Sequence, residues 1–289
     1  MKEFILSVFK FILFVGLYLL TNMGVNTYLN TNSLKVNNCK IIVIGDSHLM
    51  TGVNPNFADG LKNYAQSSEP YLASYLKLQK LLSGNSEISR VLLGFGYHNL
   101  SAYYDEKLLT NESSAIFNNN IQLLSANAFK GLDYDKERYL NSYLKKQCIY
   151  PQWGKKLYLG EFKITKSQKL KGDLNQTIFK HFYKDKSLLK FSDSFNLYYL
   201  EKIVNLCSEY NVKLTLVRTP TSSEYSRKVP RLYRDKYLEV CKAYIAQGVG
   251  VFHARENDDI FYYKDYTHLS TEGADIFTPL LINQINSIE

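Results

Sequence analysis

The fold class is decided by the stretch Lys40-Ile41-Ile42-Val43-Ile44-Gly45-Asp46-Ser47-His48. Its first five residues form a continuous apolar, largely β-branched run, which is typical of a parallel strand buried on both faces. Further strands are predicted at 63–66, 90–95, 212–217 and 249–252, and helices between and after them at 69–82, 192–210, 233–247 and 270–288. Strands that alternate with helices predict a three-layer α/β fold with one parallel sheet.

Composition limits the class of protein. The chain has 289 residues, of which 45% are hydrophobic and 21% charged, with 15 glycines and 6 prolines. These values exclude a disordered or collagen-like chain. The mean hydropathy of −0.24 excludes a polytopic membrane protein but leaves room for one spanning helix. The 24 tyrosines suit a sugar-binding surface, although a compositional bias of the genome would give the same count.

The first 20 residues read MKEFILSVFKFILFVGLYLL and predict a membrane anchor at 1–25. The run can span a bilayer if Lys10 reaches back to the headgroups on the cytoplasmic side. A cleaved signal peptide is the alternative; no alanine precedes Ala58, although Gly24 or Ser33 could precede a cut. We expect a stalk at 26–38 and a domain at 39–289 outside the cytoplasm, in the periplasm or at the cell surface.

A long insertion, at about 101–190, interrupts the α/β alternation. Residues 136–190 hold fourteen Lys and Arg against four Asp and Glu, so this part carries the positive charge of a chain whose net charge is +8. We expect a helical, basic element, which is either simply a solvated surface or faces an anionic polymer or a membrane. Nucleic acid is not an expected partner outside the cytoplasm.

The four cysteines are irregularly spaced and form no Cys-x-x-Cys motif, which excludes a zinc ribbon and a thioredoxin-type site. The predicted compartment permits one disulfide, and the sequence does not define its pairing.

Two local motifs carry candidate chemistry. Ser47 follows the first strand, where Gly45 allows a tight turn and functional groups of a parallel sheet gather. Near the other end of the chain, Asp265 and His268 are three residues apart and can face the same direction. The carboxylate would then orient the imidazole, and the imidazole would activate the Ser47 hydroxyl.

These motifs resemble the SGNH/GDSL hydrolase superfamily, in the variant found in extracytoplasmic polysaccharide O-acyltransferase and esterase domains. The resemblance covers most of the chain after the anchor, without the insertion. It implies a flavodoxin-like sheet, Ser47 as nucleophile, His268 as general base and acid, and Asp265 as orienting carboxylate. It also implies an oxyanion hole, which we assign to the backbone of Ser68, in place of the family's glycine, and to the side chain of Asn99.

Here the chain departs from the family's Gly-x-Asn-Asp block, since it reads Gly94-Phe95-Gly96-Tyr97-His98-Asn99. His98 is therefore the reserve candidate for the side-chain donor. Asp46-x-His48 also resembles the opening of a metallophosphoesterase, but the further ligand blocks of that family are poorly matched. No P-loop and no Gly-x-Gly-x-x-Gly occurs, so we expect neither a metal nor a cofactor.

The sequence thus predicts a membrane-anchored serine acyltransferase or esterase acting on O-acyl, chiefly O-acetyl, groups of polysaccharide. A membrane protein that donates the acyl group is an expected partner of the transferase. The alternative is a non-catalytic, membrane-tethered factor that binds or assembles polysaccharide on the same scaffold.

Overall fold

The computed structural model describes residues 1–31, 34–124, 126–152, 157–166, 172–254 and 262–287. The chain divides into two compact units. One comprises Met1–Ser33 and Leu108–Tyr158, and the other comprises Leu34–Lys107 and Leu159–Glu289.

The second unit contains a five-stranded parallel sheet in the order β2-β1-β3-β6-β7. The strands are β1 (Ile41–Ile44), β2 (Leu61–Asn63), β3 (Arg90–Gly94), β6 (Lys213–Arg218) and β7 (Gly250–His253). In sequence order this is the 2-1-3-4-5 arrangement of flavodoxin-like sheets, in which ligands bind beyond the carboxyl ends of the strands. The predicted three-layer α/β fold with one parallel sheet is confirmed.

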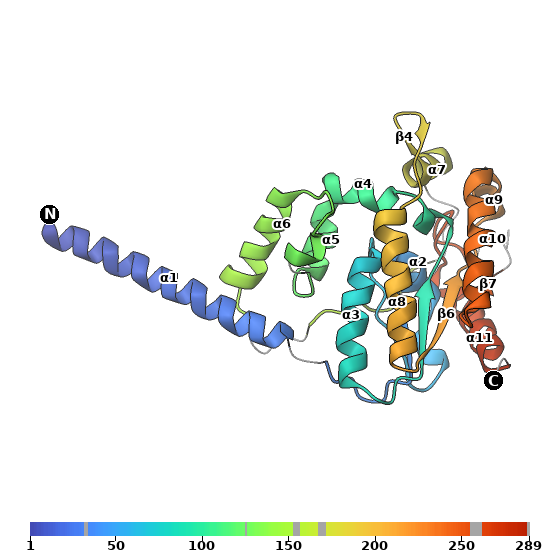
Figure 1. Ribbon diagram of the computed structural model, residues 1–289, viewed down its shortest axis with the longest axis horizontal. Helices are drawn as coiled ribbons and strands as arrows, with labels where there is room; N and C mark the ends of the chain where they lie inside the picture. The colour runs from blue at the N-terminus through green and yellow to red at the C-terminus, as the bar shows by residue number, and fades with distance from the viewer. Residues whose placement is uncertain (32–33, 125, 153–156, 167–171, 255–261, 288–289) are drawn as a thin grey trace. The chain divides into compact units, whose positions relative to one another are not determined.

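Helices cover both faces of the sheet, as the buried residues of each strand require. On one face Val43, Leu92, Val217 and Phe252 pack in one core with α2 (Ser47–Gly52) and α11 (Thr271–Ser287). On the other side α3 (Tyr71–Gly84) and α8 (Tyr198–Glu209) lie side by side in Figure 1 and pack together. The helix α10 (Arg231–Ala246) precedes β7 and contacts it.

Further short elements complete this unit. They are the 3-10 helices η1 (Pro55–Phe57) and η2 (Tyr97–Leu100), the helices α4 (Tyr103–Leu109), α7 (Leu174–Phe182) and α9 (Ser223–Lys228), a π-helical turn η5 (Asp193–Leu197), and the hairpin β4 (Tyr183–Lys184) with β5 (Ser187–Leu188). The last residues of α4 pass into the other unit.

The first unit is built on α1 (Lys2–Thr31), with α5 (Ser113–Asn120), η3 (Ala126–Phe129), α6 (Lys136–Tyr143) and the π-helical turn η4 (Leu144–Ile149). Its small core is aromatic: Phe117, Phe129, Tyr134 and Tyr139 pack edge to face or stacked. In the described part of the chain, α1 is the one helix long and apolar enough to cross a membrane, over Lys2–Leu29.

Several boundaries differ from the sequence-based expectations. The second strand ends at Asn63 instead of beginning there, because Asn63 turns inward and donates to the carbonyls of Leu49 and Val53. The helix α1 continues to Thr31 and so covers part of the range expected to be a stalk. Of the expected insertion, only 108–158 belongs to the unit of α1. All four cysteines, which lie in the described part, are buried and free.

Candidate active site

Ser47 lies at the carboxyl end of β1, where the chain turns sharply into α2. Gly45 has φ +126°, and a Cβ there would lie 3.0 Å from the backbone nitrogen of Gly94 on the neighbouring strand β3. Asp46 caps the helix by accepting a hydrogen bond from the backbone of His48 at 3.0 Å. Ser47 therefore opens α2, whose first backbone N–H groups have no partner within the helix and favour nearby negative charge.

The structure brings the three residues of the proposed relay together, although Ser47 and His268 are 221 positions apart. The Ser47 Oγ lies 2.8 Å from Nε2 of His268. The Nδ1 atom of His268 lies 2.9 Å from both carboxylate oxygens of Asp265. This order of hydroxyl, imidazole and carboxylate is the arrangement that can activate a serine for attack on a carbonyl.

A tight loop before α11 holds Asp265 and His268. Tyr263 and Leu269 pair across the loop, and the backbone nitrogen of Lys264 donates to the carbonyl of His268 at 2.9 Å. One oxygen of Asp265 also accepts from the backbone nitrogens of Thr267 and His268, both at 2.9 Å. The imidazole is thereby fixed in orientation by its own loop.

Asp265 remains ionised at neutral pH. Burial alone raises the pKa of this carboxyl, but the hydrogen bond and charge of His268, with the two backbone donors, hold its pKa well below the usual range. The His268 and Asp265 side chains are 21% and 25% exposed. A fixed negative charge at this place stabilises the imidazolium that forms when the imidazole takes a proton.

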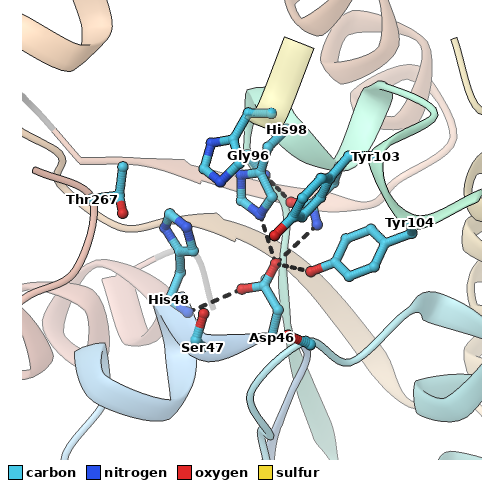
Figure 2. Close-up of polar contacts among 12 residues, drawn as sticks. Asp46, Ser47, His48, Gly96, His98, Tyr103, Tyr104 and Thr267 are labelled. Carbon is cyan, nitrogen blue, oxygen red and sulfur yellow. Dashed lines mark hydrogen bonds and ion pairs between the residues drawn. The ribbon is translucent and has the colours of Figure 1, made fainter. Parts of the chain in front are cut away.

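A second carboxylate, Asp46, lies directly before Ser47 and is buried (Figure 2). Its Oδ2 atom accepts from Nε2 of His98 at 2.7 Å, from Tyr104 OH at 2.9 Å and from Nδ2 of Asn99 at 3.1 Å. Burial raises the pKa of Asp46, but the charge of His98 and the hydrogen bonds from His98 and from the backbone of His48 lower it well below its ordinary value. From the sequence alone, Asp46 can be predicted only to cap a helix. Three of its four hydrogen-bond donors come from residues 52 to 58 positions away, and only the backbone of His48 is local.

The side chains of the residues expected to form the oxyanion hole are hydrogen-bonded to other parts of the protein. Ser68 has φ +59°, the conformation that suits the glycine it replaces, and its Oγ accepts from Nζ of Lys107 at 3.0 Å. The Asn99 side chain accepts from the backbone of Gly96 at 2.7 Å and donates to Asp46. His98, the reserve candidate, also binds Asp46. The assignment of Ser68, Asn99 or His98 to an oxyanion hole stays a prediction.

Four imidazoles form a column that begins at His268. The ring centroids of His268 and His48 are 4.8 Å apart, those of His48 and His98 4.4 Å, and those of His98 and His181 5.1 Å. The column ends at Tyr225, whose hydroxyl lies 2.7 Å from Nδ1 of His181. Burial and the charge of His98 lower the pKa of His48 to about 3, so its ring is neutral at physiological pH. Sequence reasoning missed this column, because His181 and Tyr225 belong to no motif.

Asp46, His48 and His98 offer ligand atoms that all lie within 4.8 Å of one another. However, the rings of His48 and His98 are stacked with centroids 4.4 Å apart and an interplanar angle of 20°, so their lone pairs lie in two separate, nearly parallel planes, which is a poor arrangement for binding one ion. The groups around Asp46 are hydrogen-bond donors, which suit an anion and repel a cation. The cluster fits a hydrogen-bonded carboxylate better than a metal site.

A pocket adjoins this cluster at the carboxyl ends of the strands. Its lining includes Asp46 and His48, together with Arg218, Thr219 and Thr221 at the end of β6 and just after it. It has room for part of a small polar group beside the Ser47 turn, as expected for a parallel sheet of this strand order.

No protein-family model matches the chain, and a search of curated proteins finds no match. Among solved structures, a chain named for platelet activating factor from Streptococcus pneumonia is 13% identical, with a TM-score of 0.41 over 96% of this chain and 98% of that one. A GDSL-like lipase from Bacteroides thetaiotaomicron is 11% identical, with a TM-score of 0.42 over 93% and 98%.

A third match has a title that refers to the active site of a carbohydrate esterase with divergent catalytic and non-catalytic binding functions. It is 11% identical, with a TM-score of 0.32 over 88% of this chain and 67% of that one. Two of these three titles name a GDSL-like lipase and a carbohydrate esterase. At these TM-scores the function must be judged from the side chains of this chain alone.

Proposed function

We propose that the chain is a membrane-anchored serine enzyme that transfers or hydrolyses O-acyl groups of cell-surface or exported polysaccharide. The observation that carries the proposal is the contact of 2.8 Å between Ser47 Oγ and Nε2 of His268, with Asp265 on the opposite ring nitrogen. The serine hydroxyl has a base beside it, and the base has a carboxylate that orients it. All three groups lie at the carboxyl ends of the strands, where ligands bind in sheets of this kind.

In the first half-reaction Ser47 Oγ attacks the acyl carbonyl while His268 Nε2 takes the hydroxyl proton. Asp265 stays ionised and stabilises the imidazolium. The developing oxyanion is met by backbone N–H at the start of α2, where one well-placed donor contributes about 3 kcal/mol. The imidazolium then returns its proton to the leaving oxygen, and the acyl group remains on Ser47.

In the second half-reaction an acceptor hydroxyl gives its proton to His268 and attacks the acyl carbonyl of the acyl-enzyme. The bond between the acyl group and Ser47 Oγ then breaks, and the imidazolium returns the proton to Ser47. A sugar hydroxyl as acceptor makes the enzyme a transferase, and water makes it an esterase. Both reactions use the same relay. The apolar helix α1 supports a location beside membrane-associated polysaccharide and an acyl-donor membrane protein, and so favours the transferase.

A serine-directed fluorophosphonate tests the relay in the purified full chain. We expect one labelled serine, with labelling lost in Ser47→Ala and strongly reduced in His268→Ala. The exposed Ser67 provides a matched control, since Ser67→Ala should be labelled like the wild type. Labelling that survives in Ser47→Ala would overturn the proposal.

The transferase and the esterase differ in their effect on cells. A Ser47→Ala strain should lose acyl groups from its polysaccharide if the enzyme is a transferase, and should gain them if it is an esterase. Mass spectrometry or NMR of the purified polysaccharide measures the change.

A second candidate function is a non-catalytic polysaccharide-binding or assembly factor. It is favoured because Asn99 and His98 both donate hydrogen bonds to Asp46. The two side chains expected to bind an oxyanion are thus already paired with a carboxylate. In that case the folded protein would bind glycan and would not react with the fluorophosphonate, and Ser47→Ala would not alter the binding.

A further inference from the structure

The segment 140–150, which ends α6 and forms η4, is fastened to one face of α1 within the same unit. Tyr18 OH donates to the carbonyl of Ile149 at 2.9 Å, Asn22 Nδ2 to that of Cys148 at 3.0 Å, and Asn26 Nδ2 to that of Gln147 at 2.9 Å. These three side chains are spaced four residues apart and so form one stripe along the helix. The stripe fixes the segment against the end of α1 that leads out of the apolar run.

The length of α1 determines how deep this contact lies. A hydrocarbon core of about 30 Å requires about 20 helical residues. The apolar run begins at Phe4 and is interrupted only by Ser7 and Lys10, so a span that starts there ends near Met23. Tyr18 and Asn22 then occupy the last turns of the span. If the span starts after Lys10 instead, the same residues lie deeper in the bilayer. Only the span that starts at Phe4 places the segment that they hold at the level of the lipid interface, because a span from residue 11 would put Tyr18 and Asn22 near the middle of the bilayer.

The segment presents an apolar surface with adjacent positive charge. Leu140, Leu144, Ile149 and Tyr150 are between 42% and 53% exposed. Lys145 is exposed and Lys146 half-buried. Aromatic and aliphatic side chains combined with lysines are typical of elements that lie in the membrane interface and contact anionic headgroups.

We propose that segment 140–150 is a membrane-interface collar. Its apolar side chains enter the bilayer surface beside α1, while Lys145 and Lys146 contact anionic lipid headgroups. The proposal rests on the anchoring by α1 that is part of the proposed function, and it adds a second contact with the same membrane. Two contacts prevent this unit from turning freely about the axis of α1, as a single spanning helix would allow.

The test uses the full chain in liposomes that contain phosphatidylglycerol. An environment-sensitive fluorophore is attached to Ile149→Cys, and to Lys136→Cys as the control. Lys136 is exposed and opens α6, about 10 Å along the helix from its junction with η4, the element that contacts α1. The native cysteines are buried, which limits background labelling. Quenching by nitroxide-labelled lipid is compared with quenching by aqueous iodide.

We expect the label at 149 to be quenched by the nitroxide lipid and protected from iodide, and the label at 136 to show the reverse. A label at Leu144→Cys should behave like the label at 149. Agreement between the two labels would show that the result does not come from a local distortion in one variant. Replacing Lys145 and Lys146 with glutamine should weaken the lipid quenching at 149 in phosphatidylglycerol liposomes, but not in phosphatidylcholine liposomes.

Two results would overturn the collar while leaving the anchor intact. The labels at 149 and 144 could be as accessible to iodide as the label at 136, or they could be protected from both quenchers, which would indicate a protein surface or a second copy instead of lipid. Failure of the anchor itself is distinguished by an alkaline carbonate wash, which would then remove the protein from the liposomes.

Discussion

Asp46→Ala should destabilise the sheet-containing unit more than any substitution in the Ser47-His268-Asp265 relay. Asp46 is 3% exposed, and its Oδ2 atom accepts from three buried groups. Alanine removes the carboxylate that accepts all three of these hydrogen bonds. The imidazole of His98, the amide of Asn99 and the hydroxyl of Tyr104 would then remain in the interior without their acceptor.

The magnitude follows from the number of donors. Each buried group that loses its partner costs about 1–3 kcal/mol, and removing one partner of a buried ion pair costs about 3–5 kcal/mol in total. Partial repacking and entry of water lower the sum of the individual costs. We therefore expect Asp46→Ala to lower the free energy of unfolding by about 3–5 kcal/mol, a large part of the usual total of about 5–15 kcal/mol.

Urea unfolding of the full chain in detergent, followed by far-UV circular dichroism, measures this loss. Ser47→Ala is the matched control on the adjacent residue and should lose less than about 1 kcal/mol, because its hydroxyl makes one partly exposed hydrogen bond. A loss for Asp46→Ala that is as small as that of Ser47→Ala would refute the reasoning. It would mean that the three donors find other partners at little cost.

Three further predictions concern other parts of the same unit. Asp265→Asn should lower the turnover of an activated ester by about 10⁴-fold, because the imidazole loses its orienting acceptor. Burial raises the pKa of Asp265, but the hydrogen bond and charge of His268 lower this pKa by more than burial raises it. The stability contributed by the ionised Asp265 carboxylate is therefore complete above the unfolded carboxyl pKa of about 4 and is lost as pH falls through the lower folded value. The urea midpoints of the wild type and Asp265→Asn should consequently converge in acid. Lys77→Met should cost about 3–5 kcal/mol, since it leaves Glu69 buried without the ammonium 2.5 Å away, and the double variant with Glu69→Leu should regain most of that loss in the same urea assay. Gly45→Ala should lower the melting temperature and the fluorophosphonate labelling rate together, because its Cβ would press on the backbone of Gly94.

Much of the fold could be predicted from the sequence because four of the strands are rich in β-branched and other apolar residues. The predicted strands at 40–44, 90–95, 212–217 and 249–252 agree with β1, β3, β6 and β7 to within about a residue or two at each end. β2 was misplaced because its Leu61-Lys62-Asn63 sequence carries no such pattern and is held by pairing with β1. Tertiary pairing of this kind leaves little trace in local sequence.

The candidate site divides in the same way. Ser47, Asp265 and His268 could be located because each belongs to a short local motif next to a predicted strand or helix. The partners of Asp46 could not, because Tyr104 comes from α4 and His98 and Asn99 from η2, and only the folded chain brings them together. The expected side-chain donor, Asn99, was placed by analogy with a block that this chain matches poorly.

Two carboxylate–imidazole pairs therefore flank Ser47, and their surroundings give them different capacities. In the Asp265–His268 pair the second ring nitrogen reaches the serine, and partial exposure leaves room for an acyl group to approach. In the Asp46–His98 pair the carboxylate is buried and its oxygens are occupied by hydrogen-bond donors, so it holds the start of α2 in place although it borders the pocket. Exchanging the two carboxylates for asparagine one at a time should consequently separate the two effects: the change at Asp265 should affect turnover, and the change at Asp46 should affect stability first.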